Sequence, residues 1–274
     1  MSSVELSKPI SASSLKILLK HSEKHIAKQV RIKILQLSNK AKSSHVGSCL
    51  SIVEILVVLY KNFINKKNIF ILSKGHACLA YYCVLQKFGF FSNKILNSYG
   101  KNNTILLSHV SHKVPGVQFS TGSLGHGLPY ATGRALAEKI NKTNNKIFLL
   151  ISDGELNEGT TWESLLFAAY HQLDNLIIII DYNKIQSLDF TKNVLKLEPL
   201  NKKFKSFGCN VRNINGHNFH QIYKSLLIKK NKKPTVIIAN TIKGKGVNYM
   251  ENSILWHYKF PNEKELNDAL KQLK

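Results

Sequence analysis

The stretch SDGELNEG at residues 152–159, read together with DYNKIQ at residues 181–186, decides the fold of this 274-residue chain. An apolar run comes directly before each polar segment, IFLLI at 147–151 and LIIII at 176–180. Short runs of this kind are typical of buried strands in a parallel sheet. If the two strands are neighbours, both polar segments lie at the same edge of the sheet.

Outside these segments the chain alternates between strand-like and helix-like patterns. We expect further strands at 69–72, 210–214 and 235–239, and helices at 11–38, 51–63, 162–173, 200–207, 217–229 and 262–273. This alternation predicts an α/β fold, with a mostly parallel sheet, helices on both faces, and one domain over residues 1–274. Ser51, with Glu54 three positions later, predicts a capping box at the second helix. Residues 1–10 are expected to be flexible.

The composition bounds the classes of function. Apolar residues make up 43% of the chain, which is enough for a large core, and no apolar run reaches the roughly 18 residues of a membrane span. The formal net charge is +23. The lysines are scattered, arginine is nearly absent, and no basic stripe carries interleaved aromatic residues, which argues against nucleic-acid binding. The charge instead favours anionic substrates and an acidic partner.

The four cysteines are isolated in sequence, and their spacing matches no zinc site. Buried thiols in a reducing compartment are the simplest interpretation. We therefore expect a cytoplasmic protein.

The two polar segments carry the ligands of a metal site. The Asp153 carboxylate and the Asn183 amide carbonyl are hard oxygen donors. With a backbone carbonyl, a water and two phosphate oxygens they would complete an octahedral Mg²⁺ site. Gly154 would let the backbone approach a phosphate closely, and the start of the helix near Trp162 would attract the anion. An Asp-Gly pair on its own is more simply explained as a turn. The presence of Asn183 one strand–helix–strand unit after Asp153 favours the metal site instead.

The stretch from Asp153 to Asn183 resembles the thiamine-diphosphate motif, in which GDG is followed further along by Asn. Other stretches resemble transketolase motifs, and all of them occur in the order of that family, from about residue 21 onward. They are SSHVG at 43–47, LSKGH at 72–76, STGSLGHG at 120–127, NGHN at 215–218, TIKGKGV at 241–247 and WH at 256–257. The resemblance implies the thiamine-diphosphate-binding fold.

The resemblance also implies the cofactors, thiamine diphosphate and Mg²⁺, and the roles of particular residues. Mg²⁺ would be held by Asp153, Asn183 and the Ile185 carbonyl. The cofactor would be contacted by His76, Gly122, Ser123, Leu124, Gly154, Asn183 and His257. The catalytic groups that meet the substrate would be His45, His109 and His257. Histidine suits this task because it can donate or accept a proton near pH 7.

The implied reaction is the transfer of a two-carbon ketol unit from a ketose phosphate to an aldose phosphate. Full-length family members carry a second domain that binds the pyrimidine ring and supplies an activating glutamate. Nothing after Lys274 provides this domain. We therefore expect a separate C-terminal subunit, an α2β2 assembly and no activity without the partner. Residues 122–128 and Glu158 would lie at the subunit interface.

Three departures from the family pattern leave alternatives open. Ser152 stands where the family usually has the first glycine of GDG, and His126 stands where it usually has glutamine. Around His109 the family usually reads GHP, but here Ser108 and Val110 flank the histidine. A related enzyme with another donor or acceptor (a sulfo-sugar, a branched sugar or a pyruvate-derived unit) is one alternative. A non-catalytic cofactor-binding subunit is another.

Overall fold

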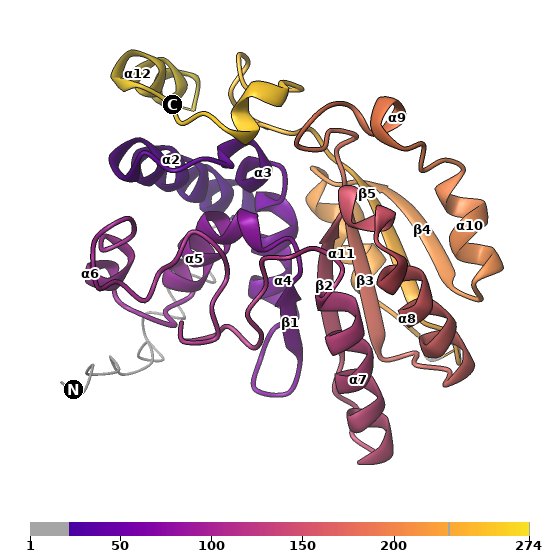
Figure 1. Cartoon of the computed structure of the whole chain (residues 1–274). Coiled ribbons are helices and arrows are strands. Elements are labelled where there is room, and N and C mark those ends of the chain that lie inside the picture. Colours follow the sequence, from indigo (N-terminus) through magenta and orange to yellow (C-terminus); the bar gives the residue numbers. More distant parts are fainter. Residues whose placement is uncertain (1–21, 230, 274) are drawn as a thin grey trace.

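The computed structural model, which describes residues 22–229 and 231–273, is built around a five-stranded parallel sheet (Figure 1). The strands are β1 (Ile69–Leu72), β2 (Ile147–Ser152), β3 (Leu176–Tyr182), β4 (Asn210–Asn215) and β5 (Thr235–Asn240). Their order is β1-β2-β3-β5-β4, and every neighbouring pair is parallel. Because β2 pairs directly with β3, with Ser152 opposite Asp181, the polar segments that follow them share one edge.

Helices cover both faces of the sheet, as predicted. Alternate strand residues point to opposite faces, so Ile177 and Ile179 belong to one apolar cluster while Ile178 and Ile180 belong to the other. The first face is covered by α2 (Glu23–Ala41), α4 (Val53–Asn62), α5 (Cys78–Lys87) and α11 (Phe219–Leu226). The second is covered by α7 (Gly127–Ile140), α8 (Gly159–Tyr170) and α10 (Leu200–Ser206). The α/β fold class is therefore confirmed.

The remaining elements are short, apart from the last helix. They are α3 (Val46–Leu50), α6 (Asn93–Leu96), α9 (Thr191–Val194), α12 (Glu263–Gln272) and the 3₁₀ segments η1 (Gly75–Ala77), η2 (Gly154–Asn157) and η3 (Ile254–His257). A capping box of Asn262 and Glu265 starts α12, which lies against α2 (Figure 1). None of the helices in the described ranges is both long and apolar enough to cross a bilayer.

Two predictions about local structure need comment. The predicted helix at 11–38 is present from Glu23 onward, whereas its first part and the predicted flexible residues 1–10 lie outside the described ranges. The capping box at Ser51 is wrong, because α4 begins at Val53 and the Ser51 hydroxyl instead donates to Asp181 at 2.7 Å. Glu54, its supposed partner, is paired with Arg31 at 2.7 Å. Both side chains therefore serve tertiary contacts.

Candidate functional site

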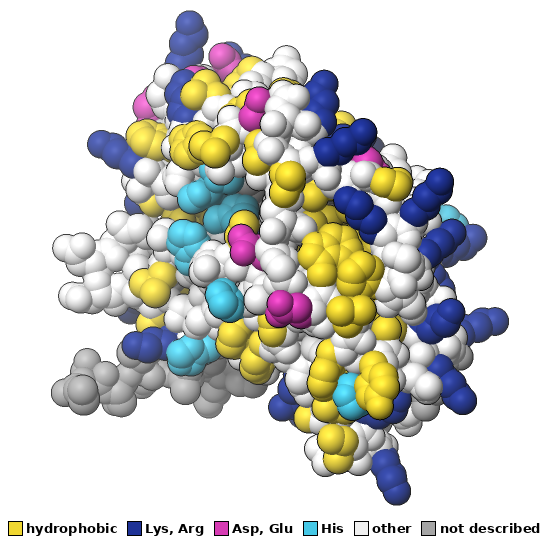
Figure 2. Space-filling view, turned by 45° about the vertical axis from the view of Figure 1, so that its right-hand side comes forward, with side chains coloured by type: hydrophobic (Ala, Val, Ile, Leu, Met, Phe, Trp, Pro, Cys, Tyr) yellow, Lys and Arg dark blue, Asp and Glu magenta, His cyan; other side chains and the backbone are white. Residues whose placement is uncertain are grey.

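A cleft of about 410 Å³ opens at the carboxyl ends of β2 and β3. Figure 2 shows histidine side chains gathered around a hollow in the surface. Of the residues singled out from the sequence, the cleft is lined by His45, His76, His109, Gly122, Leu124, Ser152, Asp153, Gly154, Glu158, Asn183, Ile185 and His257. Ser123 is exposed and does not line it. The structure thus brings together nearly all the predicted residues, from segments spread over more than 200 positions.

Asp153 and Asn183 meet at the base of the cleft. The Asp153 carboxylate accepts hydrogen bonds from the backbone N–H groups of Lys184 at 2.6 Å and Gly154 at 2.8 Å. The amide oxygen of Asn183 accepts from the N–H of Ile185 at 3.1 Å. Both side chains are buried, at 1% and 6% exposure. The loops after the two strands are therefore joined through these groups.

A second buried carboxylate, Asp181, lies near Asp153 but is fully engaged. It forms a short ion pair with Lys74, and it accepts hydrogen bonds from Ser51 and from the Asn183 amide at 2.9 Å. Burial alone would raise the pKa of Asp181, but the charge and hydrogen bond of Lys74 outweigh it and hold that pKa below its ordinary value. Asp181 has no free capacity for a metal.

Asp153, by contrast, forms no ion pair with any residue that the structure describes. Burial and the nearby charge of Asp181 raise the pKa of Asp153 to about 7. A carboxylate in this position gains most from a bound cation, because the cation offsets both effects. The described residues contain no group of three His, Cys, Asp or Glu side chains that could hold a metal. A magnesium diphosphate needs no such group, since its other ligands are carbonyl, water and phosphate oxygens. The donor set here fits that group.

Two cleft glycines, Gly122 and Gly154, differ from Gly75 in what they face. A Cβ on Gly75 would lie 2.3 Å from the Thr121 carbonyl, so packing within the protein requires that glycine. A Cβ on Gly154 would meet only the Gln186 side chain, at 3.4 Å, and one on Gly122 would meet nothing closer than 3.8 Å. Neither of these two is required by the protein's own packing. A side chain there would instead take space from the cleft.

Four histidines form a cluster above the carboxylates. The ring of His45 lies 4.8 Å from that of His257, 5.4 Å from that of His76 and 5.9 Å from that of His109, between centroids. The N–H of His45 donates to the carbonyl of His257 at 2.9 Å, which ties the two segments together. Ser44 holds the same ring, with its hydroxyl 3.0 Å from His45 Nδ1.

Three rings of the cluster, those of His45, His76 and His257, are kept neutral by their surroundings. Burial, with the nearby charges of His109 and Lys243, lowers the pKa of His45 to about 4. Burial and Lys243 lower the pKa of His257 to about 3. Burial and the Lys74 charge lower the pKa of His76 well below its usual value. Neutral rings can both donate and accept hydrogen bonds, which suits groups that pass protons between hydroxyls.

We expect the ring of His45 to stay neutral at pH 5.5. The pKa of His45 is about 4 in the folded chain, whereas its ordinary value is about 6.5. Between these two pH values the unfolded chain binds more protons than the folded one. The free energy of unfolding therefore decreases as the pH falls through this range. The Cε1–H resonance, assigned by its loss in His45→Asn, should not shift between pH 8 and 5.5 in an NMR titration. The same protein in denaturing urea is the control, where a midpoint near 6.5 is expected. A similar midpoint in the folded chain would contradict the interpretation.

Lys243 and Glu155 are among the site residues that were missed from the sequence. The Lys243 ammonium, 1% exposed, donates to the Ile185 carbonyl at 3.3 Å and lies 3.0 Å from His257 Nδ1. Burial lowers the pKa of Lys243 to about 8. Glu155, also 1% exposed, accepts from the N–H groups of Gly125 and Ser152 and so joins two cleft loops. Both residues lie inside the quoted motifs, which is the only signal the sequence offers for them.

The sequence profile of one protein family matches almost the whole described chain. That family is described as "Transketolase, thiamine diphosphate binding domain", and the match covers residues 22–273. The chain belongs to this family. The resemblance seen in the motifs is confirmed, and the cleft described above lies within this transketolase domain.

Some relatives match the transketolase domain over nearly their whole length, and two of them are described here. An apulose-4-phosphate transketolase subunit from Actinobacillus succinogenes is 44% identical over 90% of this chain and 94% of its own length. The 6-deoxy-6-sulfo-D-fructose transketolase subunit SqwG of Clostridium sp. is 37% identical over 85% of this chain and 89% of its own length.

Longer transketolases match the domain over part of their length. The solved transketolase from Campylobacter jejuni superimposes with a TM-score of 0.82 at 29% identity, covering 94% of this chain and 43% of that one. Human transketolase is 34% identical over 86% of this chain but 39% of its own length. The transketolase domain thus corresponds to less than half of these two proteins.

Proposed function

We propose that this chain is the cofactor-anchoring subunit of a two-chain transketolase, which transfers a two-carbon ketol unit between sugar phosphates. The observation that carries the proposal is the meeting of Asp153, Asn183 and four histidines in one cleft. Oxygen ligands for a magnesium diphosphate and neutral proton-transfer groups are the two components that such a transfer needs from this domain. Residues 22–273 would act together as one domain.

The cofactor would lie with its diphosphate at the base of the cleft. Asp153, Asn183 and the Ile185 carbonyl would hold Mg²⁺, and Lys243 would neutralise phosphate charge. When bound, thiamine diphosphate supplies the carbon that accepts and releases the two-carbon unit. The ring system would extend toward Gly122 and Leu124 and toward the exposed Val194 and Leu195, which also line the cleft.

The histidines would handle the protons of the substrate. His76 and His257, whose rings are 5.6 Å apart, would contact the cofactor. His45 and His109, which also line the cleft, would contact substrate hydroxyls. The bond from Ser44 leaves Nε2 of His45 as the ring atom available to a substrate.

A partner chain would complete the site. The two subunit relatives described above are named as transketolase subunits. In addition, α8 beside the cleft presents exposed apolar side chains, namely Leu166, Phe167 and Tyr170. We propose that α8 and Glu158 contact the partner, and that the active assembly is α2β2. Leu128, at the end of the predicted interface segment 122–128, is 1% exposed and packs in the core. That end of the segment cannot contact a partner.

The sugar need not be a common ketose phosphate. The matched relatives act, by their names, on apulose 4-phosphate and 6-deoxy-6-sulfo-D-fructose. Ser108 and Val110 beside His109 depart from the usual motif at the substrate side of the cleft. A branched or sulfonated donor is therefore the second candidate. We propose that the reaction takes place in the cytoplasm, which the four buried free thiols support.

Reconstitution tests the proposal. The purified chain should be inactive alone, because half of the cofactor site would be missing. It should become active with the subunit encoded beside it when Mg²⁺ and thiamine diphosphate are present. The assay would follow xylulose 5-phosphate, apulose 4-phosphate and 6-deoxy-6-sulfofructose as donors, with ribose 5-phosphate and glyceraldehyde 3-phosphate as acceptors. Turnover by the chain alone would refute the two-chain proposal, and no turnover of any sugar by the complex would refute the activity.

A further inference from the structure

The loop at residues 241–247, which follows β5, takes part in two cavities. Lys243 lines the cofactor cleft, where its ammonium donates to the Ile185 carbonyl at 3.3 Å. Lys245 and Gly246 line a different cavity, of about 660 Å³, which we call the rear cavity. Contacts that fix this loop from the rear cavity therefore also fix the position of Lys243 in the cleft.

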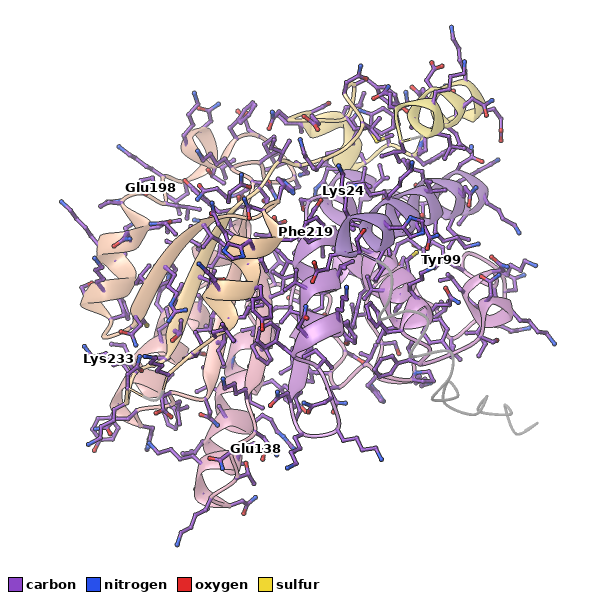
Figure 3. The ribbon with its side chains drawn as sticks, turned by 180° about the vertical axis from the view of Figure 1, so that it is seen from behind. Lys24, Tyr99, Glu138, Glu198, Phe219 and Lys233 are labelled. Atoms are coloured by element: carbon purple, nitrogen blue, oxygen red, sulfur yellow. The ribbon has the colours of Figure 1, made fainter. Side chains whose placement is uncertain are left out.

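The rear cavity lies between the first half of α2 and the turn that leads from β4 into α11. Figure 3 labels Lys24 and Phe219, which line this cavity and lie near each other on the back of the molecule. Arg31, Glu54 and His217 line it too, and they come from α2, α4 and the β4–α11 turn. We call these last three side chains the rear network.

Glu54 is the centre of the rear network. Its carboxylate pairs with the Arg31 guanidinium at 2.7 Å and lies 3.1 Å from His217 Nδ1. Burial alone would raise the pKa of Glu54, but the hydrogen bond from His217 and the charge of Arg31 hold that pKa at about 2. The carboxylate is therefore ionised at neutral pH, and it can only accept hydrogen bonds. The proton in its bond to His217 must belong to Nδ1 of the ring.

The other ring nitrogen of His217 contacts the loop. Nε2 accepts the backbone N–H of Ile242 at 2.8 Å, which requires a lone pair on that nitrogen. One tautomer, with its proton on Nδ1, satisfies both bonds. Arg31 adds a second contact, because its Nε donates to the Lys245 carbonyl at 2.9 Å. The rear network thus holds the loop one residue before Lys243 and two residues after it.

Resting on the proposed function, we propose that His217 is a positioning residue, which holds Lys243 in place for the diphosphate of the cofactor. His217 does not line the cleft, so it would act through the N–H of Ile242, the residue before Lys243. An ammonium that is already in place loses little ordering entropy when an anion binds. The proposal also gives a role to the NGHN motif at 215–218, which the cleft itself leaves without one.

Two amide substitutions separate the bond to the loop from the other contacts of His217. Asparagine can place a donor near the position of Nδ1 but is too short to reach Ile242, whereas glutamine can reach it with an acceptor. In the two-subunit complex with Mg²⁺, His217→Asn should lower the affinity for thiamine diphosphate about tenfold, as the loss of a supporting hydrogen bond does. His217→Gln should stay within about twofold of the parent, because the bond to the loop is kept. Calorimetric titration measures both.

The matched control is His220→Asn, the same substitution at an exposed histidine of α11, which should not change the affinity. Equal affinities of His217→Asn and His217→Gln would overturn the assignment, because only one of them can keep the bond to Ile242.

A double-mutant cycle tests whether the effect passes through Lys243. Lys243→Met should itself lower the affinity for thiamine diphosphate about tenfold or more, because it removes a charged hydrogen-bond donor. In that background His217→Asn should cost less than about twofold, since the group that it positions is gone. An equal loss in both backgrounds would show that His217 supports the fold in general. A parent complex that binds no thiamine diphosphate would instead refute the proposed function.

The tautomer of His217 supplies a readout in the parent chain, without cofactor. Long-range ¹⁵N–¹H correlation spectra at pH 8 should show a proton on Nδ1 of this ring and none on Nε2. The ring is assigned by the loss of its signals in His217→Gln. A proton on Nε2 would exclude the bond to Ile242 and overturn the positioning role, whether or not the complex binds its cofactor.

Discussion

Replacing Asp153 by alanine should abolish cofactor binding while leaving the fold intact. Asp153 forms no ion pair among the described residues, and burial with the nearby charge of Asp181 raises its pKa to about 7. Removing a residue that only hydrogen-bonds a metal ligand typically lowers the affinity for the metal 10–100-fold. Loss of a ligand itself should therefore cost more than about 100-fold. Calorimetric titration of the two-subunit complex with thiamine diphosphate, in the presence of Mg²⁺, measures this directly.

The same variant has a second signature that separates lost binding from misfolding. Because the pKa of Asp153 is higher in the folded chain than in the unfolded one, the carboxyl costs stability increasingly as the pH rises from about 4 to 7. At pH 8 and without metal, Asp153→Ala should be at least as stable as the parent chain. Asp268→Ala, an exposed carboxylate on α12, is the control and should change neither property. Normal affinity in Asp153→Ala would end the metal-site proposal.

The strands and the main site could be predicted because their signals are local. A run such as Leu176–Ile180 has no polar residue to place outward, so burial on both faces is its only stable arrangement. Such a strand needs helices on both faces of its sheet. The ends of the two strands also fix the positions of the residues that follow them, Asp153 after β2 and Asn183 after β3. The parallel register then brings these two residues together without any further information.

The supporting network could not be predicted, because its partners are distant in sequence. Ser51 and Glu54 fit the local pattern of a capping box, yet each makes a stronger contact with a residue from another element. Lys74 and Asp181 are 107 positions apart. In sequence, Lys74 looks like a surface lysine in a turn, and only the fold shows it at 1% exposure. Helix α7 was also missed, since its first turn contains Gly127 and Pro129, which suggest a loop.

The pairing of Lys74 with Asp181 explains how this site carries two carboxylates side by side. Charges placed that closely without compensation would force one carboxyl to remain protonated. Lys74 neutralises Asp181 permanently, so Asp153 remains the group that responds to what enters the cleft. The Lys74 ammonium also donates to the carbonyl of Ser48, at 3.2 Å, which links α3 to the strand ends.

Replacing Lys74 by methionine should therefore be among the most destabilising single changes in the chain. Methionine fills a similar volume but leaves the Asp181 carboxylate buried, at 0% exposure, without a countercharge. Breaking one side of a buried ion pair costs about 3–5 kcal/mol. Urea unfolding of the purified chain at pH 7, followed by circular dichroism, should show a loss of this size. Lys264→Met, an exposed lysine on α12, should lower the free energy of unfolding by less than about 0.5 kcal/mol.

The double variant Lys74→Met/Asp181→Asn distinguishes lost charge pairing from poor packing. An asparagine can keep hydrogen bonds to Ser51 and Thr241 but carries no charge that needs compensation. If the buried charge causes the loss, the double variant should recover a substantial part of it. The deficit of the single variant should also shrink as the pH falls, because a protonated Asp181 needs no countercharge. A deficit that persists in the double variant and does not change with pH would show that Lys74 acts through its packing alone.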